Sequence, residues 1–226
     1  MYDFDFDVIQ RSLPYLWKGL QYTVTLTLVA MAGGIVIGTL LAMARLSSIK
    51  ILYWPASIYV NLLRSTPLIL VIFWFYFLVP LIAQWITNSP TPVSIGADRS
   101  AFITFTIFEA AYYCEIIRAG IQSIPRGQVA AGYALGLTYG QSMRHVILPQ
   151  AFRNMTPVLL TQTIILFQDT SLVYVLSVTD LLGAASKVAQ RDSRLVEMYS
   201  FAAVCYFAVS YTLSLTVKRL QKRFAP

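Results

Sequence analysis

Long apolar stretches alternate with short polar connections along this chain. Five of the apolar stretches are the longest: 20–44, 67–86, 100–119, 157–177 and 198–217. A helix needs about 20 mainly apolar residues to cross the hydrocarbon core of a bilayer. We therefore predict an all-α, polytopic membrane protein with about five transmembrane helices, in which residues 19–217 form the transmembrane domain.

The composition supports this class of protein. Hydrophobic residues make up 57% of the 226 residues and charged residues only 12%, whereas soluble domains are about 25% charged. Residues 1–18 are acidic where a cleaved secretory signal would be basic. We expect them to form an extracytoplasmic N-terminal segment, and we expect the first span to remain in the protein.

The positive charges predict the orientation, because Lys and Arg in short connections are retained on the cytoplasmic side. With the N-terminus outside, 11 of the 17 Lys and Arg residues fall at the first and third connections and in the basic tail 218–226. We therefore predict that the C-terminus lies in the cytoplasm. The net charge of +7 is then mainly a topology signal, and it requires no nucleic-acid partner.

Three shorter features refine this picture. Gly34 and Gly38 have the G-x-x-x-G spacing that lets a second helix approach the first span closely. The amphipathic segment 53–64 is predicted to lie at the inner membrane interface, with its aromatic residues at headgroup level. The polar segment 177–197, on the outer side, is predicted to contain a short surface helix.

The connection 126–153 is basic and rich in glycine, and it is longer than a simple loop between two spans needs to be. Gly136 is placed to end a first short helix. Thr138 and Gln141 have the capping-box spacing that starts a second helix, and Pro149 is predicted to end it. The result is a pair of short helices with an exposed apolar knob on the cytoplasmic side.

Three roles fit such a knob. An exposed apolar surface can dock into another protein, and an interfacial helix pair held by arginines on lipid headgroups explains the amphipathic pattern equally well. A DNA-binding helix-turn-helix is disfavoured, because both ends of the segment are tethered to membrane spans.

The residues of this connection also form a longer pattern. Gly127-Gln128 is followed by Ala-Leu-Gly-Leu at 134–137, by Val-Ile-Leu-Pro-Gln-Ala at 146–151 and by Arg153. This pattern resembles the cytoplasmic signature loop of bacterial ATP-binding-cassette (ABC) import permeases, in the branch that carries polar amino acids. Further matches to that branch lie at 64–67, 111–121 and 169–172. The nearest likeness within it is to permease subunits of glutamate/aspartate importers.

The resemblance implies a type I ABC importer permease fold in the bacterial inner membrane. Residues 128–136 would then be the coupling helix, which docks on a separate ATPase subunit. The coupling residues that the resemblance implies are Gln128, Ala130, Ala131, Leu135, Gly136 and Leu137. The chain departs from the family at Ala130, where a glutamate is usual, so one polar contact with the ATPase is in question.

The chain has no G-x-x-x-x-G-K-[ST] phosphate loop, so we predict that it is not itself an enzyme and that a partner ATPase uses the ATP. Cys114, Cys205 and the single His145 form no metal-ligand or catalytic pattern, and we expect no cofactor in this chain. The expected partners are an identical or homologous permease, an extracytoplasmic amino-acid-binding protein and membrane lipid. The alternatives to an ABC permease are an ion-gradient-driven transporter or channel and a membrane-tethered regulatory protein.

Ionisable residues inside the spans are the candidate site, because a charge at the bilayer centre costs about 2.5 to 3.5 kcal/mol. Asp169, with Gln168, Thr170 and Ser171 beside it, is predicted to meet the α-ammonium of an amino acid in transit. The helix is expected to break there, as helices do beside transporter binding sites. Glu109 is a weaker candidate for the same path.

A second pair of ionisable residues has a structural interpretation. Glu115 and Arg118, three residues apart on one helix, are predicted to form a structural ion pair. An acidic cargo would be repelled by the two carboxylates of the path. A cation such as Arg118, or one from the partner permease, would have to compensate.

Overall fold

The computed structural model describes residues 4–93 and 95–224; the first three residues of the predicted N-terminal segment and the last two of the predicted tail lie outside this range. The helices are α1 (Phe6–Leu46), α2 (Lys50–Arg64), α3 (Leu68–Phe73), the π turn η1 (Trp74–Leu78), α4 (Val79–Thr87), α5 (Ala97–Gln122), α6 (Arg126–Ala134), α7 (Tyr139–Ser142), the π turn η2 (Met143–Ile147), α8 (Leu148–Asp169), the 3₁₀ helix η3 (Thr170–Leu176), α9 (Leu181–Asp192) and α10 (Leu195–Phe224). The described residues contain no strand, and the all-α prediction is confirmed.

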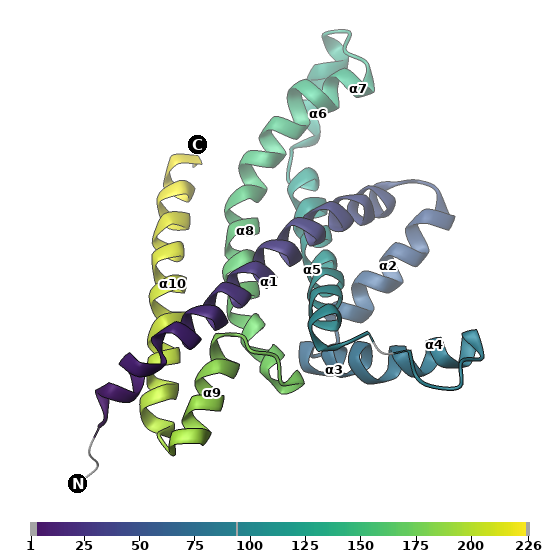
Figure 1. The fold of residues 1–226 in the computed structure, drawn as a ribbon. Helices are drawn as coiled ribbons and strands as arrows, with labels where there is room; N and C mark the ends of the chain where they lie inside the picture. The colour runs from purple at the N-terminus through teal and green to yellow at the C-terminus, as the bar shows by residue number, and fades with distance from the viewer. Residues whose placement is uncertain (1–3, 94, 225–226) are drawn as a thin grey trace.

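Five helical segments are long and apolar enough to cross a membrane, which confirms the predicted number of spans: Phe6–Leu46, Leu68–Thr87, Ala97–Gln122, Tyr139–Leu176 and Leu195–Lys222. The described N-terminus lies at one end of the bundle, while α6, α7 and the end of α10 lie toward the other (Figure 1). An odd number of spans requires this arrangement. The first helix is longer than the predicted span because Asp5 caps it, accepting hydrogen bonds from the backbone N–H groups of Asp7 and Val8.

Helix α5 is the centre of the bundle and packs most extensively against α1. The predicted close approach at the glycine pair is present. A Cβ added at Gly38 would lie 2.9 Å from the carbonyl oxygen of Ala110 and from the amide nitrogen of Cys114. Because both neighbours are backbone atoms, only glycine fits there without a shift of one helix.

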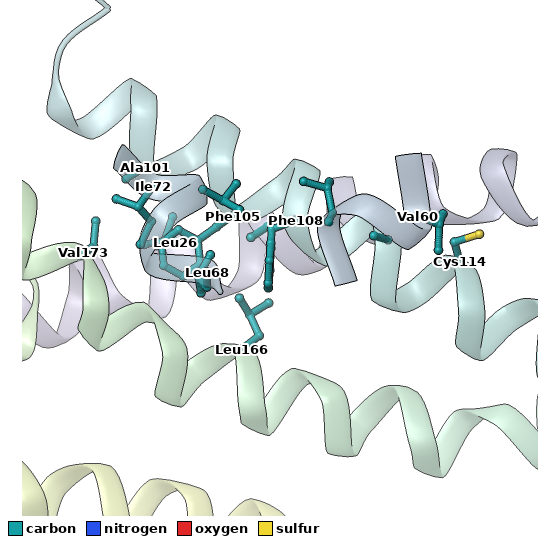
Figure 2. Packing of buried hydrophobic residues seen from close by; sticks show 14 of the residues in the cluster. Leu26, Val60, Leu68, Ile72, Ala101, Phe105, Phe108, Cys114, Leu166 and Val173 are labelled. Atoms are coloured by element: carbon teal, nitrogen blue, oxygen red, sulfur yellow. The ribbon is translucent and has the colours of Figure 1, made fainter. Parts of the chain in front are cut away.

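The main apolar core lies beside this crossing. Figure 2 shows Leu26 of α1, Phe105 and Phe108 of α5, and Leu166 of α8 close together in it. All four side chains are buried. The core therefore holds α1, α5 and α8 together, and these helices carry most of the polar residues described below.

Both π turns lie directly before a proline. The turn η1 precedes Pro80, and η2 precedes Pro149. Proline lacks an N–H and its ring clashes with the carbonyl four residues earlier, and a wider turn relieves both problems. The prediction that Pro149 ends a helix is wrong for this reason, because the helical path continues from Tyr139 through η2 into α8.

Two other sequence predictions, for α9 and for α2, differ from the packing that the structure shows. Helix α9 is not a surface helix: its small residues Ala184, Ala185 and Ala189 are fully buried, and it packs between α1 and α10. Its N-cap Asp180 is also buried, which raises the pKa of this carboxyl to about 6. The hydroxyl of Tyr206 on α10 donates to the same carboxylate (3.3 Å).

Helix α2, predicted at the interface, turns back along α5 (Figure 1). Val60 is buried in the core, and the hydroxyl of Tyr59 donates to the carbonyl of Ile107 (2.6 Å). The end of α2, at Arg64, therefore reaches the middle of α5.

Candidate functional site

The connection between α5 and α8 forms a helical hairpin that projects from one end of the bundle (Figure 1). Helix α6 ends in a Schellman motif, in which Leu137 N–H donates to the carbonyl of Gly132 (3.0 Å) and Gly136 N–H to that of Tyr133 (2.9 Å). Gly136 has a φ of 79°, a conformation that glycine adopts at low cost. The predicted helix end at Gly136 is confirmed.

The second helix of the hairpin starts as the sequence predicts. The Thr138 hydroxyl accepts from Gln141 N–H (3.3 Å), and the Gln141 side chain accepts from Thr138 N–H (2.9 Å), so the capping box is present. Because the backbone groups at the end of α6 and at the start of α7 are hydrogen-bonded, the shape of the turn between the two helices is fixed.

The tip of this hairpin is apolar and exposed. Leu135 is 81% exposed, and Tyr133 and Tyr139 beside it are 50% and 63% exposed. Five of the six predicted coupling residues are exposed and Leu137 is half-buried: Gln128, Ala130, Ala131, Leu135, Gly136 and Leu137. An exposed leucine between two exposed tyrosines, on a turn of fixed shape, is suited to binding a protein surface.

A small apolar cluster holds the hairpin on the bundle. Ile124, Ile147 and Ala151 are buried together, and Val129 of α6 and Met143 of η2 pack against them. The tip is therefore connected to α5 and α8 by packed side chains as well as by the chain itself.

Inside the bundle, Glu109 is buried between α1, α5 and α8, with 1% of its surface exposed. The Gln162 amide of α8 donates to both of its carboxylate oxygens (3.3 and 3.1 Å). Among the described residues no cation forms an ion pair with Glu109 or Asp169.

Asp169 follows Gln162 by seven residues, or two helical turns, so both lie on the same face of α8. The residues 168–171, which the sequence analysis groups as one candidate site, lie on different faces of the helix in the structure. Gln168 and Ser171 line a separate groove of about 540 Å³ against α10, where Ser210 and Ser214 lie opposite. Thr170 is buried, and its hydroxyl donates to the carbonyl of Phe167 (2.6 Å).

The helix changes its character at this point, where α8 ends at Asp169 and the tighter η3 begins at Thr170. This agrees with the predicted break beside Asp169. A change of helix type at polar residues is common at functional positions.

The Glu115 carboxylate lies at the centre of a larger charge cluster than the sequence predicts. Arg118 contacts it with Nη2 and Nε, as the three-residue spacing predicts, and Arg45 of α1 contacts it with Nη1. Arg64 of α2 lies 4.0 Å away. Arg45 and Arg64 cannot be assigned to this cluster from the sequence, because nothing in their local pattern shows that the ends of α1 and α2 meet α5 at the same place.

A cavity of about 420 Å³ opens between this cluster and α8. Arg64, Tyr112 and Glu115 form one side of it, and Asn154 and Gln162 of α8 form the other. The described residues contain no group of His, Cys, Asp or Glu that could hold a metal ion. The chemistry that this arrangement supports is the binding of a small, charged, polar molecule inside the bundle.

Comparison with known proteins gives concordant results. Residues 34–226 match the family described as "Binding-protein-dependent transport system inner membrane component". The chain is 52% identical over 225 residues to the glutamate/aspartate import permease protein GltK of Escherichia coli O6:H1, covering 100% of both chains. It is 36% identical over 219 residues to the L-cystine transport system permease protein TcyB of Bacillus subtilis, covering 96% of this chain and 90% of that protein.

A solved structure of an amino acid ABC transporter with histidines has the same fold. Its TM-score is 0.88 at 31% sequence identity, and the match covers 98% of this chain and 100% of that one. The bundle and the hairpin are therefore features that this chain shares with a known transporter.

Proposed function

The chain belongs to the family of binding-protein-dependent transport system inner membrane components and is an ABC importer permease, and on this basis we propose that it carries glutamate or aspartate into the cell. The substrate class is supported by the 52% identity over the full chain to a glutamate/aspartate import permease. Import would be driven by ATP that a separate ATPase subunit hydrolyses.

The single observation that carries the coupling role is the exposed apolar tip formed by Tyr133, Leu135 and Tyr139. An apolar tip on a turn of fixed shape fits a groove on a partner ATPase. In this proposal α6 and α7 face the cytoplasm, as does the end of α10, and the N-terminus lies outside. A second permease, identical or homologous, completes the path, and an extracytoplasmic binding protein delivers the amino acid.

The proposed path follows one face of α8, from Asn154 past Gln162 to Asp169. An α-ammonium group would interact with the Asp169 carboxylate, and the carboxyl group of Glu109 lies behind Gln162 as a second acidic side chain. Gln168, Thr170 and Ser171 remain candidates for polar contacts where α8 gives way to η3. A push on the α6–α7 hairpin would move α8 relative to α5 and so open the path alternately to either side.

The proposal is tested by reconstituting the chain with its partner permease, ATPase and binding protein in liposomes. We expect uptake of labelled L-glutamate or L-aspartate that depends on ATP inside the vesicles and on the binding protein outside. Full uptake by the chain alone, driven by an ion gradient, would contradict the proposal and indicate a secondary transporter or channel.

Replacing Asp169 with asparagine is expected to lower the initial rate of uptake about tenfold or more, because the substrate's ammonium group loses a charged hydrogen-bond partner. Among the described residues, no hydrogen bond of the fold depends on this carboxylate, so the complex should still assemble, as judged by co-purification. Asp98→Asn, which removes one exposed carboxylate at the start of α5, is the matched control and should change the rate less than twofold. Unchanged uptake by Asp169→Asn would refute the assignment.

A further inference from the structure

The charge cluster on α5 contains more positive than negative charge. Three guanidinium groups, from Arg45, Arg64 and Arg118, surround the single carboxylate of Glu115. The cluster therefore holds two positive charges in excess of its carboxylate, at a place where the bundle opens into the cavity.

The three arginines are not equivalent. Arg45 and Arg118 are in direct hydrogen-bond contact with Glu115, and Arg118 also donates to the side chain of Gln122. Arg64 is 4.0 Å from the carboxylate, at the outer limit for an ion pair. Its side chain is 40% exposed, whereas those of Arg45 and Arg118 are 11% and 24% exposed.

Arg64 is held in position by an aromatic ring. The centre of its guanidinium lies 5.6 Å from the centroid of the Tyr112 ring, which is within the range of a cation–π contact. Such a contact uses the face of the guanidinium and leaves the N–H groups at its edge available. Arg64 is thus the one arginine of the cluster that lines the cavity, and its guanidinium lies farther from Glu115 than those of Arg45 and Arg118.

The opposite wall of the cavity is suited to a polar ligand. The Asn154 side-chain amide donates to the Ser123 hydroxyl (3.0 Å), and the Gln162 amide donates to Glu109. The carbonyl oxygens of Asn154 and Gln162 accept no hydrogen bond from the part of the chain that the structure describes. The volume of about 420 Å³ falls within the range of small-ligand sites, roughly 300 to 1,000 Å³.

We propose that this cavity is a carboxylate-binding subsite, in which Arg64 binds the acidic side chain of an amino acid in transit. A guanidinium presents two parallel N–H donors that match the two oxygens of a carboxylate. This inference rests on the proposed function and deepens it. It also assigns the compensating cation: Arg118, which the sequence suggests, is engaged with Glu115 and Gln122, and Arg64 faces the cavity instead.

The subsite separates the two charges of an acidic amino acid. Its side-chain carboxylate would be held at Arg64, and its ammonium group would point toward Gln162 of α8, which also lines the cavity and donates to Glu109 of α5. An amino acid with a neutral side chain would lose only the first of these interactions. Arg64 is thus a specificity-determining residue of the permease itself.

The test compares Arg64→Gln and Arg64→Lys with Arg99→Gln, which removes one exposed cation from the start of α5. In the complete reconstituted complex, we expect Arg64→Gln to lower kcat/KM for L-glutamate uptake about tenfold or more. Arg64→Lys should recover part of the rate, because it retains the charge, and Arg99→Gln should stay within about twofold of the unchanged protein.

A second readout separates binding from a structural role. In the complex without binding protein, millimolar L-glutamate should raise the unfolding temperature more than L-glutamine does, and Arg64→Gln should abolish that difference. If Arg64→Gln keeps both the uptake rate and the preference for glutamate, the subsite is refuted. If Arg64→Gln lowers the unfolding temperature of the ligand-free complex but leaves the preference for glutamate unchanged, the subsite is also refuted. Arg64 would then act only on the fold.

The two proposals fail in different ways. If the unchanged complex takes up no acidic amino acid, the proposed function itself is wrong. If it does, and Arg64→Gln takes it up equally well, only the assignment of Arg64 is wrong.

Discussion

Replacing Leu135 with aspartate is expected to detach the ATPase subunit and to reduce ATP-driven uptake to background. Leu135 is 81% exposed at the tip between α6 and α7, and apolar residues at the centre of an interface carry much of its binding free energy. A carboxylate in an apolar groove would lose its hydration without gaining a partner. The measurement is co-purification of the ATPase with the permease in mild detergent.

The substitution should leave the permease itself intact, since the Leu135 side chain contributes little to the folded bundle. Gly140→Ala is the control: it lies in the same hairpin, and a Cβ there would meet no atom within 4 Å. Gly136→Asp is a less direct test of docking, because the φ of 79° at Gly136 strains any residue that has a Cβ, so this change also perturbs the turn itself. Retention of the ATPase by Leu135→Asp would contradict the docking role.

Replacing Gly38 with leucine is expected to prevent stable folding of the bundle. Even the first carbon of the new side chain would lie 2.9 Å from backbone atoms of Ala110 and Cys114, so α1 would have to move away from α5. Overpacking of this kind typically costs about 1–3 kcal/mol, and a large branched side chain between two backbones should reach or exceed the upper end. We expect loss of the protein from the membrane fraction, or a much lower unfolding temperature in detergent.

Val36→Leu is the matched control for this prediction. Val36 is two residues away on the same helix, and it is 62% exposed on the outer side of the bundle. The change should leave both the yield and the unfolding temperature nearly unaltered. Normal accumulation of Gly38→Leu would mean that the α1–α5 contact is not needed for folding.

Features that depend on neighbours in the chain could be predicted from the sequence. The five spans follow from the length of the apolar stretches, and the turn of the hairpin follows from Gly136, Thr138 and Gln141. The close approach at Gly34 and Gly38 follows from their spacing. In each case the physical cause lies within one continuous stretch of the chain.

Features that depend on where distant segments meet could not be predicted in this way. Arg45 and Arg64 lie on different helices, and only the fold brings both to Glu115. The polar composition of α9 suggested an exposed helix, but its alanines allow close packing and its polar side chains occupy the other face. Pro149 was expected to end a helix, and the wide turn before it removes that constraint.

In the candidate site, too, some features follow from the local sequence and others only from the fold. The polar character of 168–171 and the change of helix at Asp169 follow from the local sequence. The directions of these side chains do not, because successive residues of a helix point about 100° apart. Asp169 therefore shares a face with Gln162, while Gln168 and Ser171 lie along α10.

The helical path from Tyr139 to Asp169 has a mechanical consequence. At a rise of about 1.5 Å per residue, its 31 residues form a lever roughly 46 Å long, with the hairpin tip at one end and Asp169 at the other. The packed cluster of Ile124, Ile147 and Ala151 lies near the hairpin end of this lever and can act as its pivot. A small movement of the hairpin tip then produces a larger movement of the helix at Asp169, without the unfolding of any helix.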